Sequence, residues 1–234
     1  MNAPKREWPG DGRLREALPR SFRPTIVFIH NYGGNRSSTH RHQDMVLDMG
    51  YNCFAFQLSR GFGRGTIAAY ISELREVLDT LPGDKIIYSF SFPSVAAAAV
   101  IAGGRRDVKA WICDGGPFFD TWKCYWNLLT RWKRGNRLTR MLRTTYIWLA
   151  AGGLSYYAKV SGWLNRFDPR FPVLSIREER DVLVPEAAIA KFFACNPKLN
   201  LKVLRISGAD HLEGLKRAPE EYKRTVRMFL DSVV

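Results

Sequence analysis

The sequence predicts an α/β fold: a mostly parallel sheet with helices on both faces. Short apolar runs rich in β-branched residues alternate along the chain with segments at helical spacing. Several of these runs are apolar throughout, which is typical of strands buried on both faces of a sheet. The chain has 234 residues and no internal repeat, so it fits one such domain with a substantial core.

The first half of the chain gives the clearest alternation of strand and helix patterns. Residues 1–24 are polar, basic and rich in proline and glycine, so we expect a loosely structured N-terminal arm. The domain proper is expected to span residues 25–234. Its first elements are expected to be a strand at 25–29, a helix at about 37–49, a strand at 51–58, a glycine-rich loop at 59–65 and a helix that starts after Thr66.

A sharp strand-to-helix turn follows, with Ser91 at its corner. Residues 85–88 predict a buried strand, and the alanine-rich stretch 94–102 predicts a helix. Ser89 is the small residue that such a cramped turn needs two places before the serine, while Pro93 stands two places after it. This is a nucleophile-elbow pattern with relaxed glycines. The alternative is a helix-capping serine without chemistry.

The second half begins with a strand at 108–113 and ends with further strand and helix patterns. Between them, residues 118–170 hold twelve of the chain's thirty aromatic residues and ten Lys and Arg against two Asp. This stretch is too long for a structureless loop, so we expect a small helical cap. The remaining elements are expected to be a strand at 171–176, a helix at 185–194, a strand at 199–206 and an amphipathic helix at 215–233.

The net charge of +14 bears on partners rather than on the fold. It could attract nucleic acid, an anionic membrane surface or an acidic carrier protein. No nucleic-acid motif is recognisable, so we expect no specific nucleic acid. Four cysteines occur without a Cys-x-x-Cys pair, and Cys53 and Cys113 fall in strand-like runs, which suggests buried free thiols and a reducing, cytoplasmic location. Residues 1–20 contain no apolar signal-peptide core, and the apolar window 144–158 is too short to span a bilayer.

A serine nucleophile requires a base, and the sequence offers four histidines. His211 is the preferred candidate because it lies in the loop that leaves the last strand, at the edge of the sheet where Ser91 is expected. His40 and His42 lie beside arginines in a predicted helix, so we expect them on a solvated face. His30 ends the first strand and is expected to shape the loop that follows.

The base requires an acidic partner, and the stabilised oxyanion requires hydrogen-bond donors. Asp181, in the loop after the penultimate strand, is the preferred acid, although it could instead cap the following helix. Asp114, at the end of an earlier strand, is the second candidate. The backbone N–H groups of Tyr32 and Phe92 are the expected oxyanion donors.

At this point the chain resembles the α/β-hydrolase superfamily, close to its esterase, lysophospholipase and serine-aminopeptidase-like branch. The order Ser91, Asp181, His211 matches the order of the triad in that superfamily. Four stretches are similar to loops of that superfamily. Residues 30–35 resemble its oxyanion loop and 60–63 its Arg-Gly-x-Gly turn, while 181–185 resemble its acid loop and 208–211 its histidine loop.

The sequence departs from the pattern of this superfamily at three positions. Asn31 stands where glycine is usual in the oxyanion loop, Leu58 stands where aspartate often precedes Arg-Gly-x-Gly, and Pro93 replaces the second elbow glycine. None of these changes removes a candidate catalytic side chain. The resemblance implies an α/β-hydrolase fold with a cap inserted at about residues 118–170.

The resemblance and the residues together predict a serine hydrolase that cleaves a carboxylic ester or thioester through an acyl-enzyme, without cofactor or metal. Trp122, Trp126 and Trp148 of the cap are the expected substrate-binding residues. Two alternatives remain open from sequence. One is a non-catalytic protein of the same fold that binds an anionic partner through the basic insert, and the other is an acyltransferase.

Overall fold

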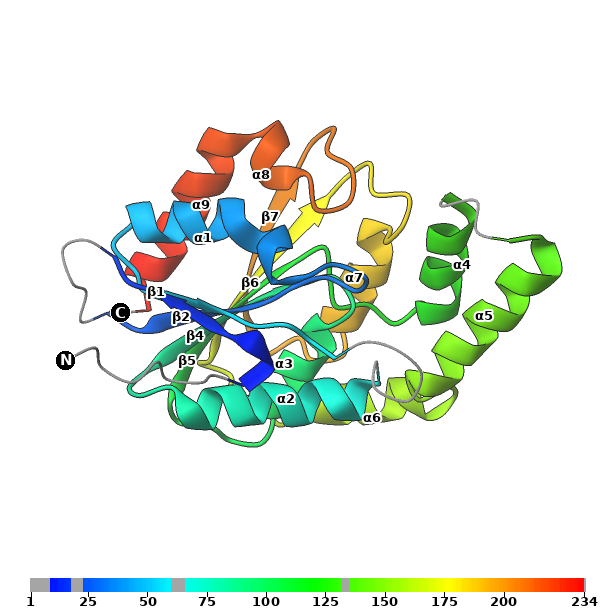
Figure 1. Ribbon diagram of the computed structural model, residues 1–234, viewed down its shortest axis with the longest axis horizontal. Helices are drawn as coiled ribbons and strands as arrows, with labels where there is room; N and C mark the ends of the chain where they lie inside the picture. The colour runs from blue at the N-terminus through cyan, green and yellow to red at the C-terminus, as the bar shows by residue number, and fades with distance from the viewer. Residues whose placement is uncertain (1–8, 18–22, 60–65, 132–134, 234) are drawn as a thin grey trace.

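The computed structural model describes residues 9–17, 23–59, 66–131 and 135–233. A seven-stranded sheet runs through it in the order β1-β3-β2-β4-β5-β6-β7 (Figure 1). All neighbouring strands are parallel except β1, which pairs with β3 in the antiparallel direction. The strands are β1 (Arg13–Arg15), β2 (Thr25–Ile29), β3 (Cys53–Ala55), β4 (Lys85–Phe90), β5 (Val108–Asp114), β6 (Pro172–Glu178) and β7 (Asn200–Ile206).

Helices cover both faces of the sheet, so the core has two apolar layers (Figure 1). Helices α2, α3, α6 and α7 pack in one layer, and α1, α8 and α9 pack in the other. The α-helices are α1 (His40–Asp48), α2 (Ile67–Thr80), α3 (Ser94–Ile101), α4 (Thr121–Arg131), α5 (Arg137–Ala150), α6 (Ser155–Leu164), α7 (Glu186–Phe193), α8 (Gly214–Arg217) and α9 (Pro219–Asp231); the short 3-10 helices are η1 (Pro9–Asp11) and η2 (Arg36–Thr39).

This architecture confirms the predicted α/β fold and its mostly parallel sheet, with three local differences. Strand β1 lies within the predicted N-terminal arm, where its backbone pairs with β3. The strand expected at 51–58 forms only over β3. The helix expected at 215–233 is divided into α8 and α9, because Pro219 has no N–H to continue a helix and instead begins a new one. The glycine-rich loop at 60–65 lies outside the described residues.

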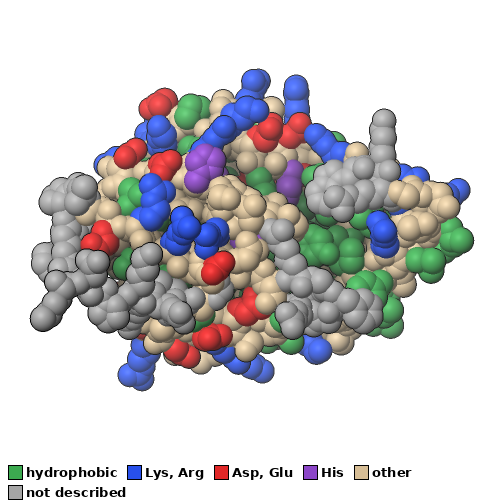
Figure 2. All heavy atoms as spheres, viewed as in Figure 1, with side chains coloured by type: hydrophobic (Ala, Val, Ile, Leu, Met, Phe, Trp, Pro, Cys, Tyr) green, Lys and Arg blue, Asp and Glu red, His purple; other side chains and the backbone are tan. Residues whose placement is uncertain are grey.

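The insert at 118–170 is helical, and its three helices differ in position. Helix α6 packs against α3 on the sheet, with Val160 and Leu164 buried in the core. Helices α4 and α5 pack against each other at one end of the molecule (Figure 1). Figure 2 shows green hydrophobic side chains gathered at that same end. In the described part of the chain, no helix is both long and apolar enough to cross a bilayer.

The cysteines follow the sequence prediction. All four are free: Cys53, Cys113 and Cys124 are buried and Cys195 is partly exposed. Burial raises the pKa of the Cys53 thiol to about 12, and burial also raises the pKa values of Cys113 and Cys124. The three buried thiols therefore stay protonated at neutral pH and behave as small apolar side chains.

Candidate active site

The site is organised by the turn between β4 and α3, where Ser91 has a positive φ of 58°. This left-handed backbone is strained in any residue other than glycine and persists only where surrounding structure enforces it. The Ser91 N–H donates to the Asp114 carbonyl at 2.8 Å, which ties the turn to the end of β5. Gly116 passes so close that a Cβ there would lie 2.3 Å from the Ser91 carbonyl oxygen. The neighbouring strand end therefore clamps the turn.

Ser89 and helix α3 show why this local sequence forms the turn. Ser89 is fully buried, and its hydroxyl accepts a hydrogen bond of 2.8 Å from the Trp111 indole N–H. All eight residues of α3 are buried, and four of them are alanines, whose small side chains let the helix lie close to the sheet. The Ser94 N–H donates to the Ser91 carbonyl as the helix begins.

Ser91, His211 and Asp181 are joined by hydrogen bonds across three loops. His211 Nε2 lies 3.0 Å from Ser91 Oγ, and His211 Nδ1 lies 2.5 Å from Asp181 Oδ2. A carboxylate at Nδ1 requires that nitrogen to carry the proton, which leaves Nε2 free to accept the proton of a serine hydroxyl. The arrangement has the connectivity of a nucleophile, a base and an orienting acid.

Asp181 is held rigidly in its loop. Its Oδ1 accepts the backbone N–H groups of Leu183 and Val184, each at 2.8 Å, while its Oδ2 faces His211. The side chain is buried, so these bonds replace the water that an ionised carboxylate would otherwise need. Asp181 does not cap the following helix, whose N-cap is Pro185 and which has no side-chain cap; its carboxyl group supports the loop and the histidine instead.

The loop after β2 brings Tyr32 to the same site. Its start is fixed by buried His30, whose Nδ1 lies 2.9 Å from the Asn31 carbonyl and whose Nε2 accepts the Leu58 N–H at 3.1 Å. His30 therefore shapes this loop, as the sequence predicts. Tyr32 and Phe92 both border the cavity beside Ser91, and among the described residues neither backbone N–H has an acceptor.

A cluster of buried acidic side chains lies close to Asp181 and His211. The Tyr222 hydroxyl donates to Asp114 Oδ2 at 2.5 Å, and the Tyr88 hydroxyl is hydrogen-bonded to that of Tyr222. Burial raises the pKa of Asp114, while burial and then the charge of Asp114 raise the pKa of Glu178 well above its usual range. Both Glu178 carboxyl oxygens and Asp114 Oδ1 are buried without a hydrogen-bond partner among the described residues, an environment that favours the protonated form of Glu178.

His42 corrects one sequence expectation. His40 is exposed, as predicted, but His42 is buried against the rings of Tyr88, Phe90 and Tyr222. Burial, reinforced by the neighbouring positive charges of α1, lowers the pKa of His42 to about 3. The residue therefore stays neutral near pH 7 and belongs to the core.

Beside Ser91 lies a cavity of about 100 Å³. Helix α4 contributes three of the residues that line the cavity, and the others come from the loops around Ser91, Asp181 and His211. The cavity is lined by Asn31, Tyr32, Ser91, Phe92, Phe118, Cys124, Tyr125, Leu128, Leu183, Val184 and His211. The lining residues of α4 recur three and four positions apart, and this spacing in the sequence is the signal that could have identified them.

Trp122, Trp126 and Trp148 are not among the residues that line this cavity. Trp122 and Trp126 stack on each other with ring centroids 5.5 Å apart, and the Arg140 guanidinium lies 5.9 Å from the Trp126 ring. Trp122 is exposed, and Trp126 and Trp148 are half-buried. The aromatic side chains at the cavity are instead those of Tyr32, Phe92, Phe118 and Tyr125.

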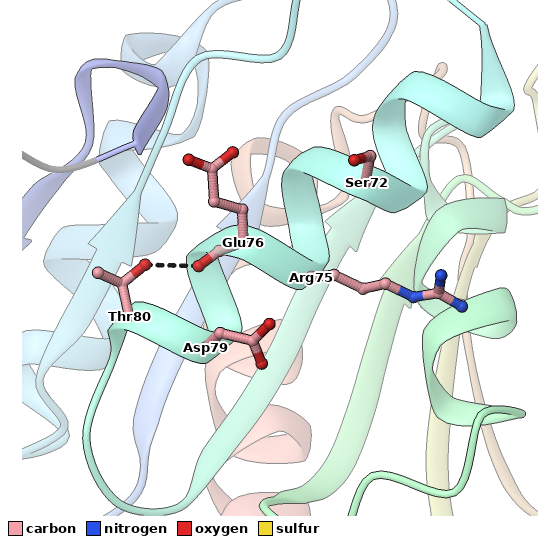
Figure 3. Close-up of a pocket in the computed structure, with 5 residues that line it drawn as sticks. All are labelled: Ser72, Arg75, Glu76, Asp79 and Thr80. Carbon is pink, nitrogen blue, oxygen red and sulfur yellow. Dashed lines mark hydrogen bonds between the residues drawn. The ribbon is translucent and has the colours of Figure 1, made fainter.

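A second hollow lies on the surface of α2 (Figure 3). Its lining side chains all come from this one helix, and the Thr80 hydroxyl is bonded to the Glu76 carbonyl within it. Asp79 there also pairs with Arg105 at 2.5 Å. Because its described lining residues all belong to one helix, the hollow is a solvated helix face. Within the described ranges, no group of three or more His, Cys, Asp or Glu could hold a metal ion.

Comparison with known proteins places the fold. No protein-family model matches the sequence, and no curated protein sequence matches it either. Solved structures do match, including an esterase from Pyrococcus furiosus with a TM-score of 0.69 and 19% identity, over 90% of this chain and 82% of that chain. A bromoperoxidase from Bacillus anthracis matches with a TM-score of 0.68 and 17% identity, over 94% of each chain.

A monoacylglycerol lipase from Paleococcus ferrophilus also matches, with a TM-score of 0.64 and 14% identity, over 95% of this chain and 98% of that chain. These neighbours share the α/β-hydrolase fold, and the present chain therefore has that fold, as its sequence motifs predict. At such identities the likeness concerns the fold, so the chemistry must be argued from the site itself.

Proposed function

We propose that the protein is a serine hydrolase that cleaves a carboxylic ester or thioester through an acyl-enzyme. The observation that carries this proposal is the hydrogen-bonded chain of Ser91, His211 and Asp181, with Ser91 strained on its turn. A serine that merely caps a helix needs neither a strained backbone nor a histidine oriented by a buried carboxylate. The esterase and the lipase among the structural neighbours support the same class of reaction.

In the first half of the reaction, Ser91 Oγ attacks the carbonyl carbon and its proton moves to His211 Nε2. The carbonyl oxygen becomes an oxyanion, which the N–H groups of Tyr32 and Phe92 stabilise. Asp181 stabilises the imidazolium that forms. When the tetrahedral intermediate collapses, the bond to the alcohol or thiol breaks, and the leaving group takes the proton from Nε2. The acyl group remains on Ser91 as an ester.

In the second half, water attacks this ester and gives a proton to His211 Nε2. A second oxyanion forms in the same place, collapses, and returns the electron pair and the proton to Ser91 Oγ. The carboxylic acid leaves, and the serine is regenerated. The balance requires only substrate and water, so none of these steps needs a cofactor.

The cavity favours a short acyl group. An apolar cavity of about 150 Å³ holds a benzene molecule, so a cavity of about 100 Å³ suits a smaller hydrocarbon group. Its apolar lining includes Phe118, Leu128 and Val184, which suits a hydrocarbon chain. We therefore assign acyl binding to the apolar residues that line the cavity, and not to Trp122, Trp126 and Trp148. We also propose that the domain expected at 25–234 takes in β1 as well, and that within the insert at 118–170 the cap is formed by α4 and α5, since α6 packs on the sheet; α4 is the part that meets substrate.

A chain-length series tests this proposal directly. We would measure kcat/KM for aryl esters and acyl thioesters carrying acetyl, butyryl, octanoyl and palmitoyl groups, with Ser91→Ala as the control. The expected result is a rise from acetyl to butyryl, a low value for palmitoyl, and no turnover by the variant. Turnover of no member of either series would contradict the proposal, and equal turnover by Ser91→Ala would contradict the role of the serine.

The same series separates the alternatives. An acyltransferase would turn over the substrates only when an acceptor alcohol or amine is added, with the acyl group recovered on that acceptor. A non-catalytic protein would bind without turnover. The positive charge predicts an anionic partner, either a membrane surface or an acidic carrier, and this partner also stays a proposal. Helix α5 favours the membrane surface.

A further inference from the structure

The solvent-facing side of helix α5 is apolar. Leu138, Leu142 and Leu149 are 60%, 61% and 60% exposed. Separations of four and eleven residues place them on one line along the helix. Met141 and Tyr146 flank that line and are also exposed. We call these five residues the α5 apolar face.

Helix α5 turns only part of its apolar surface inward, where partly buried Ile147 packs against the core. Thr144 is fully buried, whereas the leucines point to solvent. The face also continues past the end of the helix. A Cβ on Gly153 would lie 3.5 Å from the side chain of Leu149, and the next residue, Leu154, is 90% exposed. Contiguous exposed apolar surface of this kind marks an interaction site.

Positive charge surrounds the α5 apolar face. Arg137 and Arg143 are exposed on the same helix, which contains three arginines and no acidic residue. The insert as a whole carries ten Lys and Arg against two Asp. In Figure 2, blue Lys and Arg side chains lie beside the green side chains at this end of the molecule. A partner must therefore offer both an apolar phase and negative charge.

We infer that the α5 apolar face binds the surface of an anionic lipid bilayer. The leucines would enter the boundary between headgroups and acyl chains, while Arg137 and Arg143 would contact lipid phosphates. A second copy of this chain fits less well, because pairing two such faces would bring their arginines together. Binding does not require Ser91 chemistry, so this inference goes beyond the proposed function and can fail independently of it.

Co-sedimentation of the full-length protein with vesicles tests the inference. We would compare vesicles of phosphatidylcholine alone with vesicles containing one-third phosphatidylglycerol, at low and high salt. We expect binding to the anionic vesicles to weaken as salt is raised, and binding to the neutral vesicles to be much weaker. Leu142→Gln with Leu149→Gln should reduce the partition coefficient by about tenfold for each leucine.

The charged part of the face is tested separately. Arg137→Gln with Arg143→Gln should reduce binding to anionic vesicles by about fivefold for each arginine and leave binding to neutral vesicles unchanged. Met228→Gln is the matched control, because Met228 is 66% exposed on α9, whose buried side packs in the other core layer. That control should bind as wild type does.

Three results would overturn the inference. The first is equal binding by wild type and the double leucine variant. The second is no preference for anionic over neutral vesicles. The third is a wild-type dimer in light scattering that the leucine substitutions convert to a monomer, which would assign the α5 apolar face to a second copy of the chain.

Discussion

The assignment of Asp181 as the orienting acid leads to a sharp prediction about Asp181→Asn. In the structure, Oδ1 accepts two backbone N–H groups and Oδ2 faces His211 Nδ1. The asparagine oxygen must take the Oδ1 position, because an NH₂ group cannot accept those two donors. Its NH₂ group then faces Nδ1 and can only donate to it. The substitution therefore reverses the tautomer of His211.

With Nδ1 as acceptor, the proton of the neutral imidazole lies on Nε2, which can no longer take the Ser91 proton. We expect kcat to fall on the order of 10⁴-fold, as for other triads with the wrong tautomer. This corresponds to about 5 kcal/mol of lost transition-state stabilisation. KM should change little, since Asp181 does not line the cavity.

Steady-state hydrolysis of an aryl butyrate measures this effect, with thermal melting to verify folding. Asp210→Asn is the matched control: Asp210 adjoins His211 in the chain but its carboxylate faces Arg131 at 3.8 Å. Asp114→Asn is the decisive comparison, because an asparagine oxygen can still accept the Tyr222 hydroxyl. We expect both to stay within about tenfold of wild type. A folded but inactive Asp114→Asn beside a nearly normal Asp181→Asn would refute the reasoning.

Three further predictions follow from strained, buried or crowded positions. At Ser91, Gly should give a more stable protein than Ala by about 1 kcal/mol in urea unfolding, because φ is positive, whereas at helical Ser94 Ala should be the more stable. When the pH falls from 7 to 5, His42 takes up a proton in the unfolded chain but not in the folded chain, where its pKa is about 3. The free energy of unfolding should therefore fall by about 2 kcal/mol over this range, and His42→Phe should remove that loss. Gly116→Ala should reduce kcat/KM by about 100-fold, because its Cβ would lie 2.3 Å from a backbone oxygen and displace the turn; near-normal activity would contradict the described clamp.

Local patterns made much of this fold predictable. A few consecutive residues are enough to predict the apolar strands β2 and β4, the helix cap at Thr66 and the alanine-rich helix α3. Because the carboxyl ends of parallel strands meet at one edge of a sheet, the loops after β4, β6 and β7 could also be expected to converge. That rule is sufficient to bring Ser91 and His211 together from sequence alone.

Other features depend on contacts between distant parts of the chain. From sequence Asp181 is the preferred acid and Asp114 the second candidate, since both follow strands, and the hydrogen bonds of the structure separate them: Asp181 bonds His211, whereas Asp114 bonds Tyr222. Strand β1 pairs through its backbone, which its two arginines and single leucine do not reveal. The burial of His42 follows from its spacing from Met45 and Val46 on the buried face of α1, and its arginine neighbour in the sequence does not reveal it.

The insert shows a third limit. Its composition predicted helices, and tryptophan was expected at the substrate because it offers the largest apolar surface. The helical phase of α4 instead turns Cys124, Tyr125 and Leu128 to the cavity and leaves Trp122 exposed. The direction a helix faces depends on what it packs against, and this is set by the tertiary fold.

The central claim is that Ser91 is the acyl-accepting nucleophile, and covalent labelling tests it most directly. The wild-type protein would be incubated with a fluorophosphonate probe, digested, and analysed by mass spectrometry. We predict one modified peptide that carries the probe on Ser91, and no modification of folded Ser91→Ala. An unlabelled wild-type protein, or a probe attached to another residue and retained by the variant, would contradict the account.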